Sequence, residues 1–240
     1  MTYLNKAPIQ EAVFDFRVKL PSSISPDVFL NLNRDALSSY PLVEPHRSIT
    51  SGFRLFEGKP IVEKTQDRKD GYVYKTSDEK NIAQFRENGF TFSRLNPYTD
   101  WNTVKDEAKK LWDIYCSVAK PEIITRVALR YINRLDFIFP VKMEDFFSQP
   151  PSVPETIAKD IKGYTVRFVI QRDELMANII QTTIDLPEKT KIGIIFDIDA
   201  YYMDDSGINK DIWMTFQKLR EFKNLIFFKS ITEKTVEMYK

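Results

Sequence analysis

The sequence predicts an α+β fold made mainly of antiparallel sheet, in two similar halves that are each covered by a Trp-led helix. Three observations lead to this prediction. Residues 12–20 alternate apolar and charged side chains, β-rich runs separated by turn residues fill residues 48–95, and amphipathic helical patterns begin near Trp101 and Trp213. Alternation with one polar face is typical of antiparallel strands. Helices with one apolar face are suited to cover such a sheet.

Composition limits the classes of protein that the chain can belong to. Its 240 residues are 42% hydrophobic, which is enough for a packed core. The 35 Lys and Arg nearly balance the 34 Asp and Glu, so a long-range basic field for nucleic acid is absent, although a local patch is left open. Cys116 is the one cysteine, which excludes an intrachain disulfide and fits a reducing compartment. With neither a signal peptide nor a long apolar span, we expect a cytoplasmic protein without membrane contact.

The first strand, residues 12–20, places its apolar side chains on one face: Ala12, Phe14, Phe16, Val18 and Leu20. A helix is predicted next, with Ser25 as its cap and Pro26 in its first turn, ending before Pro41. Its apolar stripe would contain Phe29, Leu32, Ala36, Leu37 and Tyr40. His46 is expected in the loop that follows.

Residues 48–95 are expected to form an antiparallel meander. Its turns are predicted at Glu57-Gly58-Lys59, at residues 77–80 and at Glu87-Asn88-Gly89, and Asn-Gly is a strong hairpin signal. Aromatic side chains on adjacent strands are expected to form core beneath a helix; the alternative is a surface that stacks bases. These side chains are Tyr72, Tyr74, Phe85, Phe90 and Phe92.

The clearest helix is predicted between a cap at Thr99 or Asp100 and a stop at Lys120-Pro121. Its buried face would hold Trp101, Val104, Ala108, Leu111, Trp112 and Tyr115. A strand follows over residues 124–140. Strands, a helix with Ile212, Trp213, Phe216 and Leu219 on its inner face, and a short helix capped by Thr232 complete the second half.

Two α+β halves are therefore expected, residues 1–147 and 155–240, in one unit with a Pro-rich connection at 148–154. The stretches FTFSRLNPYTDW and IIFDIDAYYMDDSGINKDIW follow the same course of strand, loop, Trp and helix. Duplication and convergence on a common pattern are both left open.

The stretch ITRVALRYINRLDFIFP holds the first candidate site. Arg130 and Arg134 lie four residues apart on its polar face, about 13 Å along a strand, where they could grip phosphates or carboxylates. Alternatively they pair with neighbouring acids such as Asp136. Asn133 is the polar exception on the apolar face and needs hydrogen-bond partners there. These three residues are candidates for ligand or anion binding, which includes nucleic acid or a nucleotide.

Asp197 and Asp199 form a second candidate site. They alternate on a predicted strand, so both carboxylates point to the same side. Mg²⁺ binds one or two carboxylates together with water and substrate phosphates, so this pair is a candidate metal site for phosphoryl transfer or a nuclease. Solvated or ion-paired aspartates are the alternative reading. No cofactor is otherwise predicted.

Catalytic motifs are missing from the sequence. It has no glycine-rich phosphate loop, no G-x-S-x-G and no H-E-x-x-H, and His46 is the one histidine. As a nucleophile Cys116 would need an activating base, and the one candidate is His46, about seventy residues upstream, so a structural thiol is the favoured interpretation. We therefore predict no catalytic residue and favour a protein that is not an enzyme.

Four landmarks carry a family resemblance: Lys6-Ala7-Pro8-Ile9-x-Glu11-Ala12, Phe92-Ser93 before Tyr98-x-x-Trp101, Leu129-Arg130-Tyr131-Ile132-Asn133-Arg134 and Ile231-Thr232-Glu233. Along nearly its whole length the chain resembles a sporadically distributed family of uncharacterised prokaryotic proteins of similar size. The resemblance implies no catalytic residues. Patchy distribution is common among host-defence and toxin–antitoxin genes, which is an association and gives no mechanism.

The leading functional prediction is a non-enzymatic binding or adaptor protein that acts through a protein partner, in a host-defence or toxin–antitoxin setting. Exposed strand edges of a large sheet invite such association. The alternatives are nucleic-acid or nucleotide binding through Arg130 and Arg134, and a metal-dependent enzyme at Asp197 and Asp199. A homo-oligomer is also left open.

Overall fold

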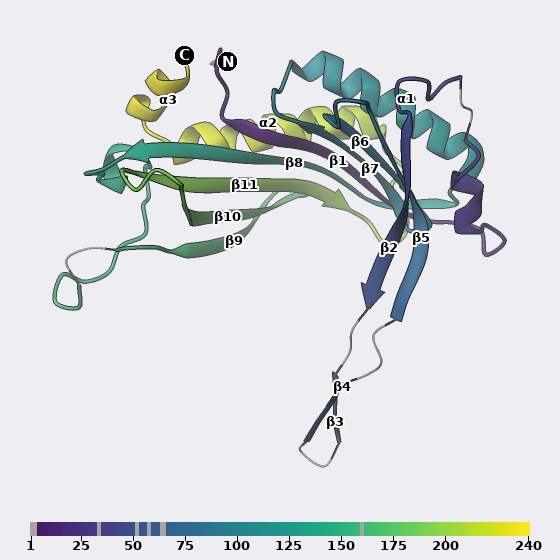
Figure 1. Cartoon of the computed structure of the whole chain (residues 1–240), viewed down its shortest axis with the longest axis horizontal. Helices are drawn as coiled ribbons and strands as arrows, with labels where there is room; N and C mark the ends of the chain where they lie inside the picture. Colours follow the sequence, from purple (N-terminus) through teal and green to yellow (C-terminus); the bar gives the residue numbers. More distant parts are fainter. Residues whose placement is uncertain (1–3, 33–34, 51–52, 57–58, 63–65, 159–160) are drawn as a thin grey trace.

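A computed structural model describes residues 4–32, 35–50, 53–56, 59–62, 66–158 and 161–240. Within them, nine strands form one antiparallel sheet in the order β2-β5-β6-β7-β1-β8-β11-β10-β9, and β3 and β4 form a separate hairpin (Figure 1). The strands are β1 (Ile9–Lys19), β2 (Leu42–Thr50), β3 (Phe53–Phe56), β4 (Lys59–Val62), β5 (Gln66–Lys75), β6 (Asn81–Arg86), β7 (Gly89–Leu95), β8 (Ile123–Ile138), β9 (Thr165–Arg172), β10 (Leu175–Asp185) and β11 (Lys191–Met203).

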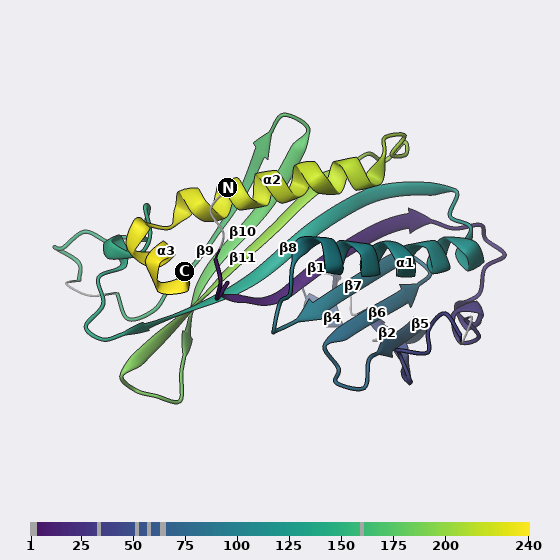
Figure 2. The ribbon, with the colours of Figure 1, turned by 90° about the horizontal axis from the view of Figure 1, so that it is seen from above.

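Two long helices, α1 (Trp101–Ala119) and α2 (Ile212–Ser230), lie on the same face of the sheet (Figure 2). Asp100 caps α1 by accepting a hydrogen bond from Thr103 N, and Asp211 caps α2 in the same way. The short α3 (Glu233–Tyr239) follows α2 and has Thr232 as its cap. The opposite face of the curved sheet carries no helix of the described chain (Figure 1).

The two halves of the sheet have the same internal order. The central neighbours β1 and β8 each open a half, β7 and β11 flank them, and β6 and β10 follow outward. Each half then ends in its covering helix, α1 or α2, and tryptophan is the first or second residue of that helix. The predicted fold class is confirmed. The topological repeat begins at Ile123, and the division of the chain at 148–154 stays a prediction about folding units.

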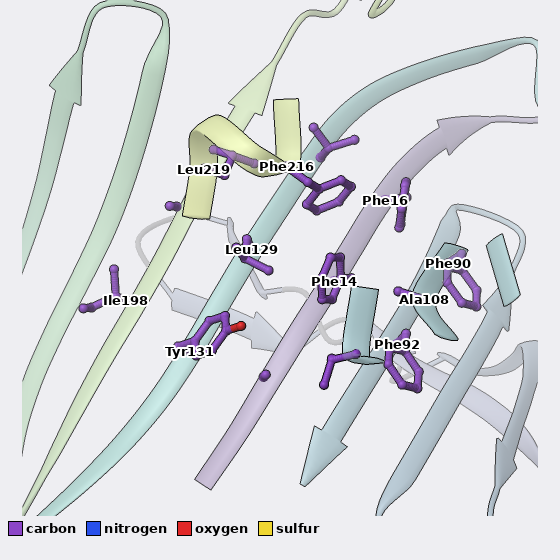
Figure 3. Packing of buried hydrophobic residues seen from close by; sticks show 14 of the residues in the cluster. Phe14, Phe16, Phe90, Phe92, Ala108, Leu129, Tyr131, Ile198, Phe216 and Leu219 are labelled. Carbon is purple, nitrogen blue, oxygen red and sulfur yellow. The ribbon is translucent and has the colours of Figure 1, made fainter. Parts of the chain in front are cut away.

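One aromatic core joins the halves, because β1 contacts both helices. Phe16 stacks on Trp112 of α1 with ring centroids 4.0 Å apart, and its ring lies 5.1 Å from Phe216 of α2. The ring of Phe14 lies 5.5 Å from Trp101 and 5.0 Å from the same Phe216. Figure 3 shows Phe14 and Phe16 of β1 beside Phe216. Burial of each large apolar side chain contributes roughly 1.5–3 kcal/mol. The aromatic residues predicted as core in β5, β6 and β7 are buried, which leaves no stacking platform there.

The helix predicted between Ser25 and Pro41 is wrong in the described residues. Only a 3-10 turn, Pro26–Phe29, forms there, with Ser25 as its cap. Tyr74 of β5 donates its hydroxyl to Phe29 O (2.6 Å) and Leu30 O (3.1 Å). These carbonyls are the acceptors that a longer helix would use for its next N–H groups, so the bonds from Tyr74 compete with continuation of the helix. The expected apolar stripe is still largely buried: Phe29, Leu32, Leu37 and Tyr40.

The strand prediction succeeded for the meander and failed at His46. β3 and β4 pair in the predicted hairpin, whose turn residues Glu57 and Gly58 lie outside the described residues. His46 lies in strand β2, which pairs with β5, and not in a loop. Pro45 and the irregular register after His46 hid this strand, because both are features of sheet edges.

Candidate functional site

The open face of the sheet carries ion pairs centred on Asp15 of β1. Arg126 of β8 donates to Asp15 (2.9 Å) and to Asp199 of β11 (2.7 Å). Arg86 of β6 lies 3.4 Å from Asp15, and Thr91 donates its hydroxyl to the same carboxylate (2.8 Å). These side chains are largely buried, so each charge needs the other to offset its loss of water. This arrangement is typical of a structural network.

Arg130 and Arg134 lie on this open face, as the alternation predicted, and each has a carboxylate partner. Arg130 grips Asp197 with Nε (2.8 Å) and Nη2 (2.5 Å). Arg134 donates two bonds of 2.9 Å to Asp136. These hydrogen bonds raise the pKa of both guanidiniums. Their side chains stay 45% and 37% exposed, so they are paired but not sealed inside. Anion binding by them stays a prediction.

Asn133 lies on the opposite, helix-covered face, so the structure does not bring it together with the two arginines. Its amide nitrogen donates to Tyr131 O (3.3 Å) and to Phe196 O (3.0 Å). The side chain is buried, as expected for a polar exception in an apolar row, and these bonds satisfy its nitrogen. Asn133 also lines a cavity beside α2.

Asp197 and Asp199 project to the same side, as predicted for the metal candidate. Each already accepts hydrogen bonds from an arginine, Arg130 or Arg126. Burial raises the pKa of Asp199 and outweighs the opposite effect of Arg126. Among the described residues no group of three His, Cys, Asp or Glu side chains is placed to hold a metal ion. Arg130 occupies both carboxylate oxygens of Asp197, and Arg126 occupies Oδ2 of Asp199.

His46 and Cys116 lie on different elements. His46 Nδ1 is 2.5 Å from Asp70 on the neighbouring strand β5. Cys116 lies in α1, where burial raises the pKa of its thiol to about 12. A thiol held in its protonated form is a poor nucleophile. Among the described residues, no hydrogen bond joins the two side chains.

The outer edge strand β9 is unusually exposed. Phe168 and Val169 are 56% and 54% exposed, and β9 pairs only with β10 in the described sheet. Arg167 donates to the neutral Asn178 (2.6 Å). Neither Arg167 nor Arg172 forms an ion pair with a described residue. The edge therefore combines free backbone groups, apolar side chains and uncompensated positive charge.

A cavity of about 680 Å³ lies on the other face, between the N-terminal segment, the start of α1, strand β8 and the second half of α2. Three of the four sequence landmarks described above meet in it. They contribute residues 6–9, Tyr98 with Trp101, and Tyr131 with Asn133. The hydroxyls of Tyr98 and Tyr131 are 3.0 Å apart. Segments far apart in the chain thus build one partly enclosed polar and aromatic space.

Lys223 of α2 extends into this cavity, although it is only 8% exposed. Its Nζ lies 3.6 Å from the centre of the Tyr131 ring, and it forms no ion pair or hydrogen bond with a described residue. Burial, and then the charge of Arg220, lowers the pKa of Lys223 to about 7. Arg220 lines the same cavity and lies 5.0 Å from the centre of the Trp101 ring.

The sequence contains a signal for Lys223. Phe216, Leu219, Lys223 and Phe227 follow one another at spacings of three and four, so the lysine interrupts the buried face of a helix. A lysine in such a row is either paired or functional, because burial of a lone charge is costly.

Comparisons with known proteins add no assignment: no family model matches the chain, and no curated protein is similar enough to match it. Within the described residues, the helices are too short or too polar to span a lipid bilayer. The candidate sites therefore rest on their geometry.

Proposed function

We propose that this chain is a non-enzymatic binding protein that receives an extended, acidic segment of a protein partner along the edge strand β9. The observation that carries the proposal is the exposed, uncompensated edge formed by Arg167, Phe168, Val169 and Arg172. Addition of a strand to a sheet edge provides main-chain hydrogen bonds, and side chains on both faces provide specificity.

The two edges of the sheet support this choice of strand. The β2 edge contains Pro45, which lacks an N–H, and an irregular register after His46, both of which oppose further pairing. The β9 edge pairs with β10 in continuous register from Thr165 to Arg172 and has no proline. Positive charge at Arg167 and Arg172 favours a partner strand with acidic side chains.

The backbone of β9 presents a defined set of outward groups. Thr183 N donates to Tyr164 O (3.0 Å), so the backbone of Tyr164 faces β10. In an antiparallel pair this direction alternates with each residue. Arg167 and Val169 therefore direct their N–H and C=O groups away from β10, toward an added strand.

Val169→Pro tests the proposal because it removes an outward N–H while the bonds to β10 remain. Val169→Thr keeps the N–H and serves as the matched control. Wild type, Val169→Pro and Val169→Thr would be used to capture proteins from the host extract, and a captured protein would then be purified. We expect the affinity of the captured protein to be at least about tenfold lower for Val169→Pro than for wild type, which corresponds to about 1.4 kcal/mol. For Val169→Thr we expect the wild-type affinity.

Hydrogen exchange of the purified complex locates the contact. Protection of residues 165–172 on binding supports the proposal. Equal binding by wild type and Val169→Pro, or protection elsewhere, contradicts it. A concentration-dependent dimer that Val169→Pro abolishes would instead assign the edge to a second copy of this chain.

The other functions predicted from the sequence have weaker support. Nucleic-acid binding requires Arg130 and Arg134 to leave Asp197 and Asp136. Metal-dependent chemistry requires Asp197 and Asp199 to leave their arginines. Both changes uncover charges that are now neutralised. A host-defence or toxin–antitoxin role is compatible with a binding protein and rests on the family resemblance alone.

A further inference from the structure

Two cations share the cavity beside α2 without a negative partner. Arg220 and Lys223 are three residues apart, so their side chains lie on neighbouring positions of one helix face. Neither forms an ion pair with a described residue. Their contacts are with aromatic rings, Arg220 over Trp101 and Lys223 over Tyr131. Two like charges in a partly enclosed space repel each other more strongly than they would in water.

The enclosed lysine is the second observation that points to a ligand. Lys223 is more than nine-tenths buried, yet its ammonium group has three donors and no acceptor among the described residues. The Nζ atom keeps some access to the cavity, so it lacks a hydrogen-bond partner at a place that a ligand can reach. The side chain lines the cavity, so a bound molecule can reach it.

The other groups in the cavity limit the chemistry of that molecule. The charged or titratable groups that line it besides Lys223 are Lys6, Tyr98, Asp100, Tyr131 and Arg220. Asp100 is already engaged with Thr103 at the start of α1, through its backbone N–H and its hydroxyl. The cations therefore exceed the available acids. A volume of about 680 Å³ is in the range of pockets that hold small organic molecules.

We propose that this cavity binds a small organic anion, whose carboxylate or phosphate group lies between Arg220 and Lys223. The anion neutralises two charges that have no other partner, and the planar guanidinium of Arg220 matches the oxygens of either group. The Tyr98 and Tyr131 hydroxyls and the Asn133 amide are placed to contact the rest of the molecule.

The inference is independent of the protein partner proposed for β9, since the cavity lies beside α2 and between residues of other strands. Calorimetric titration of the full chain with benzoate and with inorganic phosphate, at constant ionic strength, tests it. Benzoate stays ionised throughout the neutral range and is the probe for pH dependence. Because the bound form needs a protonated Lys223, benzoate affinity is expected to fall as the pH rises above about 7, where the lysine loses its proton.

Variants separate this site from adventitious binding. Lys223→Met is expected to weaken binding of the recognised probe at least about tenfold, and Arg220→Gln is expected to weaken it as well. Lys229→Met changes the same charge at an exposed position of the same helix and is expected to bind like wild type.

Each outcome decides the proposal. Binding of benzoate but not phosphate assigns a carboxylate ligand, and the reverse assigns a phosphate ester. Equal affinity in wild type, Lys223→Met and Arg220→Gln overturns the proposal, as does the absence of binding of both probes at about 20 mM, a concentration that detects even millimolar affinity.

Discussion

The two faces of the sheet differ in the partners of their buried cations, which are carboxylates on the open face and aromatic rings on the helix-covered face. On the open face Arg126 reaches two carboxylates, Asp15 and Asp199. On the helix-covered face Lys223 and Arg220 meet only aromatic rings among the described residues. The same residue types therefore have carboxylate partners on one side of the sheet and none on the other, although Nε of Arg86 lacks a hydrogen-bond partner within the open-face network.

This difference separates structural from functional charge. A cation with its acids in place needs nothing further, and removal of an acid exposes the cost of desolvation. A cation without an acid carries that cost in the free protein and loses it when an anion binds. The sequence alone does not distinguish the two, because arginine and lysine look the same in both settings.

The largest expected loss of stability comes from removal of Asp15, the central carboxylate of the ion pairs on the open face. Asp15→Ala leaves the buried Arg86 without its carboxylate, and Arg126 keeps only Asp199. We expect a loss of about 3–5 kcal/mol in the free energy of unfolding, measured by urea denaturation.

Asp136→Ala is the matched control, because its partner Arg134 is half-exposed and the pair lies near water. It is expected to cost less than about 1 kcal/mol. Similar losses for Asp15→Ala and Asp136→Ala would show that burial of the network is unimportant.

On the helix-covered face, replacement of Lys223 is expected to increase the free energy of unfolding. Burial holds the pKa of Lys223 near 7, well below its usual 10.5, so the folded chain binds fewer protons than the unfolded chain between these values. Wild-type stability due to this group therefore rises with pH across that window and is lowest below pH 7. Lys223→Met removes the penalty, and we expect about 2–3 kcal/mol of stabilisation at pH 7, less than the full pKa difference implies because solvent relaxes around the amine.

Urea denaturation of both proteins at pH 7 and at pH 10 measures this gain. The difference between Lys223→Met and wild type should shrink toward the higher pH. A difference that stays constant, or a loss of stability at both values, would mean that Lys223 is not held in a desolvated site.

The smallest effect is expected from metal. Because Asp197 and Asp199 accept from Arg130 and Arg126, about 5 mM MgCl₂ is expected to shift the melting temperature by less than about 1 °C. A clear rise in wild type that Asp197→Asn removes would reverse this expectation and favour the metal-dependent alternative.

Local patterns predicted most of the fold. The alternation in β8 assigned both faces of that strand, and burial follows the period of two from Leu129 to Ile138. The buried face of α1 followed from its spacing of three and four residues, and Asp100, one of the two expected caps, closes its first turn. In both elements local preference and tertiary packing agree.

The failures come from contacts between distant residues. Tyr74 bonds to a carbonyl that the helix expected after Pro26 would have used. His46 lies in a strand because its segment pairs with β5. The cavity unites residues 4–9, 96–102, Tyr131 and the second half of α2. No window of sequence contains such a site, so its residues could be suspected only from Lys223 within an apolar stripe.

The central position of β1 has a consequence for synthesis. Both of its neighbours, β7 and β8, come later in the chain, and β8 starts at Ile123. Until about half of the polypeptide has been made, β1 therefore has no β8 to pair with. Closure of such long loops is slow and entropically costly. During synthesis, β1 therefore exposes an unpaired edge and the apolar side chains Phe14 and Phe16, and non-native association must be avoided until β8 has been made.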